Sequence, residues 1–108
     1  MENVNVKDLE EKLKNLAKNY ENIDTSDFQG ILLSYETLYG IHYQELFNRV
    51  AKMIIKRRLD NFDNIVTSNP CYNSEFVRED KKELIEQLEK EFDCEIDYIS
   101  YEIKFLYE

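Results

Sequence analysis

Apolar residues near the start of the chain recur with helical spacing. Their steps alternate between three and four residues, at Val6, Leu9, Leu13, Leu16 and Tyr20. This spacing predicts an amphipathic helix with one narrow apolar stripe. A coiled-coil seam has the same pattern, but it is indicated only when the pattern lasts about three or four heptads. The pattern here is shorter, so we expect a helix that packs on the protein's own core.

A second helix is predicted to begin in the polar segment at residues 24–27. Ser26 and Gln29 have the spacing of a capping box, in which two side chains satisfy free N–H groups at a helix start. Gly40 is predicted to end this helix, since glycine adopts the left-handed conformation at little cost. Between these limits lies a wide apolar face, made of Phe28, Ile31, Leu32, Tyr35, Leu38 and Tyr39.

A third helix is predicted from about His42 to Asp60, with apolar residues on two faces. A helix of this kind usually packs against more than one neighbour. Its polar stripe contains two pairs of opposite charge at i,i+4 spacing, Glu45 with Arg49 and Lys56 with Asp60. The first apolar face consists of Tyr43, Leu46, Phe47, Val50, Met53 and Ile54, and the second of Ile55, Leu59 and Phe62.

The helical pattern breaks between residues 61 and 74. Asn69-Pro70 indicates a turn, and the apolar and β-branched residues 65–67 fit a short strand. Helical spacing returns from about Glu79 to Phe92, with an apolar face made of Leu84, Ile85, Leu88 and Phe92.

The last segment, residues 94–107, alternates between apolar and polar residues, which predicts a strand. The alternation changes phase near Tyr98, which indicates a bulge or kink there. A helix is the alternative for this segment, because Ile96, Ile99, Ile103 and Leu106 also have helical spacing. A strand needs a partner strand, which we expect either from residues 63–78 or from another chain.

Together these elements predict a single domain over residues 1–108. Its expected fold is α+β and mainly helical. It has three N-terminal helices, then a further helix and a C-terminal strand in a small sheet. An all-α domain is the alternative. A chain of this length can bury a core without disulfides or metals, and its 43% apolar content argues against disorder.

Charge is distributed unevenly along the chain. Residues 41–62 carry five bases and two acids, whereas residues 63–108 carry thirteen acids and five bases. The formal net charge of −9 argues against general affinity for nucleic acid, because phosphate binding needs clustered positive charge. An acidic surface that also carries tyrosines favours a basic protein partner instead.

Several kinds of site are disfavoured by the composition. Gly30 and Gly40 are the two glycines, and they are too far apart to form a phosphate-binding loop. With one histidine and no paired CxxC motif, the chain cannot form a zinc finger. The acids at residues 91–97 could bind a divalent cation, but they lack EF-hand spacing, and a solvated acidic edge is the simpler interpretation. We expect no metal, no cofactor and no catalytic residues.

The location is expected to be cytoplasmic, since no long apolar segment and no signal peptide are seen. Cys71 and Cys94 are then free thiols, with a disulfide as the alternative in an oxidising compartment. The many Asn, Lys, Ile, Tyr and Glu residues are typical of an AT-rich bacterial or phage genome.

Residues 28–58 resemble, in outline, the helix-turn-helix of DNA-binding proteins. Gly40-Ile41-His42 would form the turn, and the following helix is basic. This resemblance implies a transcriptional regulator that contacts DNA through Arg49, Lys52, Lys56, Arg57 and Arg58. Alternatively these bases neutralise neighbouring acids, or face a partner or the acidic surface of a second copy in a homodimer.

The leading hypothesis is a small, non-enzymatic binding protein that inhibits or titrates a macromolecular partner. Immunity proteins, antitoxins and phage inhibitors of host defence form this class. An enzyme or small-ligand binder built around His42 is a further alternative. The residues expected to contact a basic partner are acids and tyrosines of the C-terminal segment: Glu91, Asp93, Glu95, Asp97, Tyr98, Tyr101 and Tyr107.

Overall fold

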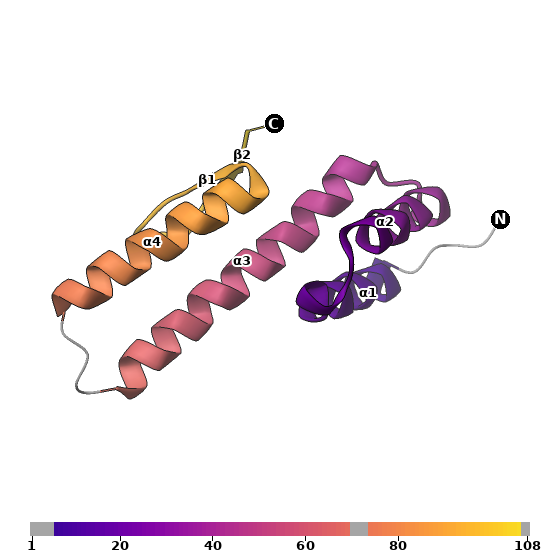
Figure 1. Cartoon of the computed structure of the whole chain (residues 1–108). Coiled ribbons are helices and arrows are strands. Elements are labelled where there is room, and N and C mark those ends of the chain that lie inside the picture. Colours follow the sequence, from indigo (N-terminus) through magenta and orange to yellow (C-terminus); the bar gives the residue numbers. More distant parts are fainter. Residues whose placement is uncertain (1–5, 70–73, 107–108) are drawn as a thin grey trace. The chain divides into compact units, whose positions relative to one another are not determined.

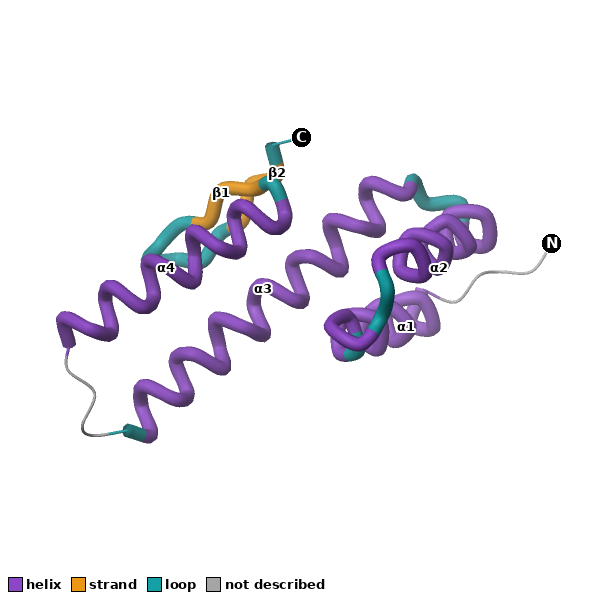
Figure 2. Tube along the Cα trace, viewed as in Figure 1, coloured by secondary structure: helices purple, strands orange, loops and turns teal. Residues whose placement is uncertain are grey.

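The structure is a computed structural model that describes residues 6–69 and 74–106. These residues form the helices α1 (Val6–Lys18), α2 (Thr25–Tyr39), α3 (Tyr43–Ser68) and α4 (Ser74–Phe92), a 3-10 turn at Tyr20–Asn22, and the strands β1 (Cys94–Ile96) and β2 (Ile103–Phe105) (Figure 1). The two strands form an antiparallel sheet at the C-terminal end (Figure 2). The predicted mainly helical α+β fold is confirmed, and the all-α alternative is wrong.

The chain divides into two compact units, Met1–Ile54 and Ile55–Glu108. Helix α3 passes from the first unit into the second without interruption. The division describes how the chain packs, and the expectation of one domain over residues 1–108 stays a prediction.

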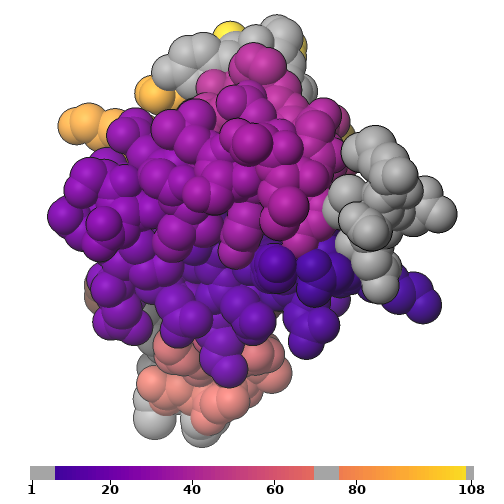
Figure 3. Space-filling model, turned by 90° about the vertical axis from the view of Figure 1, so that its right-hand side faces the viewer, coloured from indigo at the N-terminus to yellow at the C-terminus, as the bar shows by residue number. Residues whose placement is uncertain are grey.

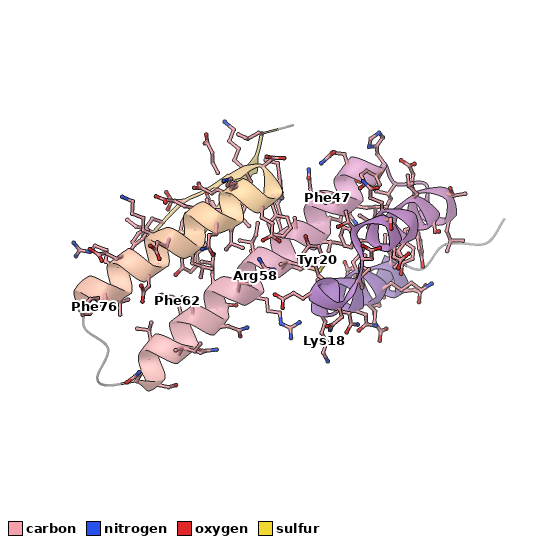
Figure 4. All side chains as sticks on the ribbon, in the orientation of Figure 1. Lys18, Tyr20, Phe47, Arg58, Phe62 and Phe76 are labelled. Carbon is pink, nitrogen blue, oxygen red and sulfur yellow. The ribbon has the colours of Figure 1, made fainter. Side chains whose placement is uncertain are left out.

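The first unit is built around apolar side chains from three helices. Phe28 lies at its centre, with edge-to-face ring contacts to Tyr20 at 5.2 Å and to Phe47 at 6.0 Å between centroids. Figure 4 labels Tyr20 and Phe47, and Figure 3 shows one face of this unit in indigo to magenta. The stripe predicted for the first helix does pack on the protein's own core. The buried apolar residues are Leu9, Leu13, Leu16, Phe28, Leu32, Leu46, Val50, Ala51 and Ile54.

Capping residues were predicted at both ends of α2, and the structure confirms one of the two predictions. At its C-terminus Gly40 has a φ of 70° and donates its N–H to Glu36, so this prediction is confirmed. The predicted capping box is wrong, because Asp24 is the N-cap and its side chain makes no capping bond. The Ser26 hydroxyl instead donates to the Asp24 carboxylate at 3.2 Å.

The second unit is built from the end of α3, helix α4 and the sheet. Its core combines Ile55 and Leu59 with Ile85, Leu88, Phe92, Cys94, Ile96 and Phe105. The two apolar faces predicted for the third helix thus serve different units, since Leu46, Val50 and Ile54 belong to the first.

Two helix limits differ from the prediction. Helix α3 continues to Ser68 rather than ending near Asp60, so the short strand at residues 65–67 is wrong. Its last turns contain no glycine or proline, and the Thr67 hydroxyl donates to the Asp63 carbonyl one turn earlier at 2.8 Å. Helix α4 begins at Ser74, five residues before the predicted start.

The C-terminal segment folds as a hairpin rather than as one kinked strand. Cys94 pairs with Phe105, Glu95 with Lys104 and Ile96 with Ile103. The two phases of alternation are therefore two strands, and the helical alternative is wrong. The expected partner strand from residues 63–78 is also wrong for the described residues in that range, which are helical apart from Asn69.

Candidate functional site

Side chains along the hairpin alternate between buried and exposed, and the buried ones attach the hairpin to α4. Cys94, Ile96 and Phe105 are buried, whereas Glu95 and Lys104 are exposed. Strand β1 is also fixed by a side chain of the helix, because the N–H of Ile96 donates to the Glu89 carboxylate at 2.9 Å. These contacts hold the base of the hairpin and leave its turn exposed.

The hairpin turn, residues 97–102, is organised by the Asp97 carboxylate. One oxygen of this carboxylate accepts hydrogen bonds from the N–H of Ile99 at 3.1 Å and from the N–H and hydroxyl of Ser100 at 2.7 and 2.9 Å. The Asp97 carbonyl accepts the N–H of Tyr101 at 2.9 Å. Hydrogen bonds from the Ser100 N–H, the Ser100 hydroxyl and the Ile99 N–H lower the pKa of Asp97, because they stabilise its charged form.

The turn presents an apolar side chain to solvent. Ile99 is 88% exposed, the highest value among the large apolar residues of the described chain, and its neighbour Tyr98 is 38% exposed. An isoleucine in such a position gains nothing for folding. Its backbone is nevertheless held in place by the bonds to Asp97, so the side chain is displayed on an ordered support.

A second cluster connects the turn to α3 and α4. The Tyr101 hydroxyl donates to the two carboxylate oxygens of Asp63 at 3.1 and 3.0 Å. The Lys81 ammonium lies 4.6 Å from the ring centre of Tyr98 and 4.5 Å from that of Tyr101, within cation–π distance of both. Tyr101 has a φ of 62°, which is unusual for a residue other than glycine and is held here by these contacts.

The charges in this cluster shift the pKa values of two of its members. Burial alone would lower the pKa of Lys81, but its interactions with Tyr101, Asp63 and Tyr98 outweigh burial and raise it. Burial, aided by Asp63, raises the pKa of Tyr101 despite the opposing effect of Lys81. Lys81 therefore stays charged and Tyr101 stays protonated at neutral pH, as their contacts require.

The four acids predicted to bind a partner do not form one free row. Glu91 pairs with Arg58 of α3 at 3.0 Å, and Asp97 is used by the turn. Asp93 directly follows the last residue of α4 and has a φ of 51°, and its carbonyl accepts the N–H of Leu106. Glu95 lies exposed on β1. Of the predicted tyrosines, Tyr98 and Tyr101 lie in the cluster at the turn, and Tyr107 lies outside the described residues.

An open groove of about 710 Å³ runs along the hairpin. Four carboxylates and one ammonium face it together with apolar side chains, so a cationic group is favoured there over an anionic one. The lining residues are Glu89, Cys94, Glu95, Ile96, Asp97, Glu102, Ile103 and Lys104. In residues 6–69 and 74–106 no three His, Cys, Asp or Glu side chains are grouped as metal ligands.

Sequence reasoning missed three contributors to this site: Ile99, Glu102 and Lys81. Ile99 was assigned to a strand interior, yet Asp97 followed three residues later by Ser100 is a turn signal. Glu102 was interpreted only as the polar side of a strand. Lys81 had no signal, because its contacts with Tyr98 and Tyr101 depend on how the hairpin lies on α4.

The basic residues of α3 are divided between the two units. In the first unit Arg49 pairs with Glu45 at 3.8 Å, as predicted, and Lys52 is exposed. In the second unit Lys56 and Arg57 are exposed, and Arg58 is engaged by Glu91. The predicted pair between Lys56 and Asp60 is not seen among the described residues.

His42 has a structural contact at the start of α3. Its Nδ1 accepts the N–H of Gln44 at 3.1 Å, and the Glu36 carboxylate accepts the N–H of Tyr43 at 2.7 Å. Both bonds satisfy N–H groups that a helix start leaves free. His42 therefore acts as the N-cap of this helix.

Cys94 is a free thiol that is buried in the second unit, and Cys71 lies outside the described residues. Burial, together with the nearby charges of Glu89 and Asp93, raises the pKa of Cys94 to about 11. The thiol is therefore protonated at neutral pH, and a protonated thiol is a poor nucleophile.

Comparison with protein-family models, curated proteins and solved structures found no match to this chain. Among the helices of the described residues, none has the length and apolar character that crossing a bilayer demands.

Proposed function

We propose that this chain is a small acidic, non-enzymatic binding protein that inhibits or titrates a macromolecular partner. The partner is a protein with a basic surface, and the C-terminal hairpin is the element that contacts it. The proposed class includes immunity proteins, antitoxins and phage inhibitors of host defence. A cytoplasmic location in a bacterial or phage-infected cell is part of this proposal.

One observation carries the proposal: the exposed Ile99 lies on a turn that is held by Asp97 and flanked by exposed carboxylates. An apolar side chain that is already ordered binds at a lower entropic cost than a mobile one. The surrounding carboxylates would steer encounter with a basic surface and speed association. Glu95 and Glu102 are the acids best placed for this, since both are exposed and both line the groove.

The acids engaged inside the protein have a different role in this proposal. Glu91 and Asp97 support the hairpin through Arg58 and through the turn. Reversing their charge would disturb the fold as well as the surface. Glu95 is exposed and lines the groove, so it is the better position for a charge test.

The test is a capture experiment with three purified baits in lysate of the native host. The baits are the wild type, a hairpin variant carrying Glu95→Lys, and a control carrying Glu86→Lys on α4. Both variants change the net charge equally. The proposal expects a protein with a basic surface on the wild-type and control baits that is lost from the hairpin variant.

The proposal fails if the same proteins are retained equally by all three baits, or if nothing is retained above a resin control. Association between the retained protein and the wild type should also slow as salt is raised, because exposed charges are screened. Circular dichroism of the three baits checks that each is folded.

A DNA-binding regulator is the second candidate, favoured by three exposed bases on α3, Lys52, Lys56 and Arg57. The three-residue connection from α2 to α3, with Gly40 in the left-handed conformation, also keeps the outline of a helix-turn-helix. Titration of duplex DNA at two salt concentrations tests this candidate. A regulator must bind duplex DNA more weakly at the higher salt concentration.

A further inference from the structure

The two edges of the hairpin differ in how their backbone groups are satisfied. On β1 the outward N–H of Ile96 donates to the Glu89 carboxylate at 2.9 Å, so this edge is closed by α4. Between the strands, the N–H of Asp97 donates to the Glu102 carbonyl at 2.9 Å and the N–H of Leu106 to the Asp93 carbonyl at 3.0 Å. In an antiparallel ladder, every second residue of a strand points its N–H and C=O toward the partner strand. Glu102 and every second residue after it therefore point these groups toward β1.

The same alternation turns the N–H and C=O of Ile103 away from β1. In the described part of the chain no hydrogen bond to either of these two groups is seen. A strand edge with outward N–H and C=O groups of this kind is a template for another strand. The outer edge of β2 is therefore the side on which the sheet can grow.

We propose that this edge pairs with β2 of a second copy of the chain, antiparallel, with Ile103 facing Ile103 of the second copy on a two-fold axis. In this register the outward N–H of each Ile103 donates to the carbonyl of the other. Glu102 faces Lys104 of the second copy, and Lys104 faces its Glu102. These positions do not exchange hydrogen bonds, so their side chains approach most closely.

Other registers lack this charge complementarity. Centring the axis on Lys104 places lysine opposite lysine, and centring it on Glu102 places glutamate opposite glutamate. Like charges that face each other directly destabilise a strand pair. A lysine on a strand edge normally deters pairing, but in the Ile103-centred register it meets a carboxylate. The sequence of β2 is thus complementary to itself in one register.

The test uses sedimentation velocity of the purified protein over micromolar to millimolar concentrations. We expect reversible dimerisation of the wild type. Glu102→Lys alone and Lys104→Glu alone each place like charges opposite each other twice, so each should weaken self-association at least about tenfold. When the two variants are mixed, every facing pair is again of opposite charge, so a mixed dimer should form with about wild-type affinity.

Lys82→Glu and Glu86→Lys on the exposed side of α4 are the matched controls and should self-associate like the wild type. Circular dichroism checks that each variant is folded. A wild type that stays monomeric over the whole range overturns the proposal and leaves the edge to a strand of another protein. Single variants that associate normally, or a mixture that does not recover, overturn it as well. None of these outcomes depends on whether the hairpin also binds a basic partner.

Discussion

The Tyr101 hydroxyl donates to both carboxylate oxygens of Asp63, at 3.1 and 3.0 Å, and so joins the hairpin to the end of α3. The two residues are 38 positions apart in the sequence. Tyr101 also places its ring beside the Lys81 ammonium. One side chain therefore fixes the turn to both helices of the second unit.

Tyr101→Phe should destabilise the protein by about 1 kcal/mol, because it removes a partly exposed hydrogen bond to a charged group. The ring and its contact with Lys81 remain. The measurement is urea unfolding followed by circular dichroism. Tyr98→Phe is the matched control, since the Tyr98 hydroxyl has no hydrogen-bond partner in the described chain. Equal stability of the two variants would show that the bond to Asp63 contributes nothing.

Protonation of Asp97 should loosen the hairpin turn. The pKa of this carboxyl is lowered from its ordinary value of 3.8 in the folded protein. A lowered pKa contributes stability that is present above the unfolded value and is lost as the pH falls through the folded value. NMR titration of the Asp97 carboxyl and the Ser100 amide should therefore give a common midpoint below 3.8.

In Asp97→Ala the Ser100 amide should exchange with solvent faster at neutral pH, because its acceptor is gone, while amides in the middle of α2 should be unchanged. A titration midpoint at or above 3.8, or unchanged exchange of Ser100, would mean that the carboxylate does not organise the turn.

Cys94 should react slowly with thiol reagents at neutral pH. Its pKa of about 11 leaves little thiolate, and its side chain is buried. In a Cys71→Ser variant, which isolates Cys94, the rate of reaction with a disulfide reagent should rise steeply from neutral pH toward pH 11. Denaturant should remove most of the protection. A fast reaction of the folded protein at neutral pH would contradict both the burial and the raised pKa.

The sequence pattern predicted helices best where a single face is buried within one unit. The stripe that contains Leu9, Leu13 and Leu16 and the glycine stop at Gly40 are both local signals, and both are confirmed. The end of α3 was misjudged because Ile65, Val66 and Thr67 favour strands by propensity. The helix continues there because tertiary contacts, such as that of Asp63 with Tyr101, override propensity.

The C-terminal segment that carries the candidate site was singled out from the sequence, but its internal contacts were not predicted. Alternation located the C-terminal segment and its acidic character. The change of phase near Tyr98 was interpreted as a kink, although it marks the turn between two strands. The periodicity of the sequence does not show which acids form ion pairs or hydrogen bonds within the protein, because the partners of Glu91 and Asp97 depend on the fold. The exposure of Ile99 depends on the fold in the same way.

The central claim is that the ordered turn around Ile99 contacts a basic protein partner. The most direct test compares the affinity of wild type, Ile99→Ala and Leu38→Ala for the protein that the wild-type bait retains, by surface plasmon resonance. Leu38 is the control because it is 59% exposed on α2, in the first unit. An anchoring side chain typically contributes about 2 kcal/mol. The account predicts a dissociation constant raised roughly thirtyfold for Ile99→Ala and unchanged for Leu38→Ala, whereas equal affinity of all three proteins would contradict it.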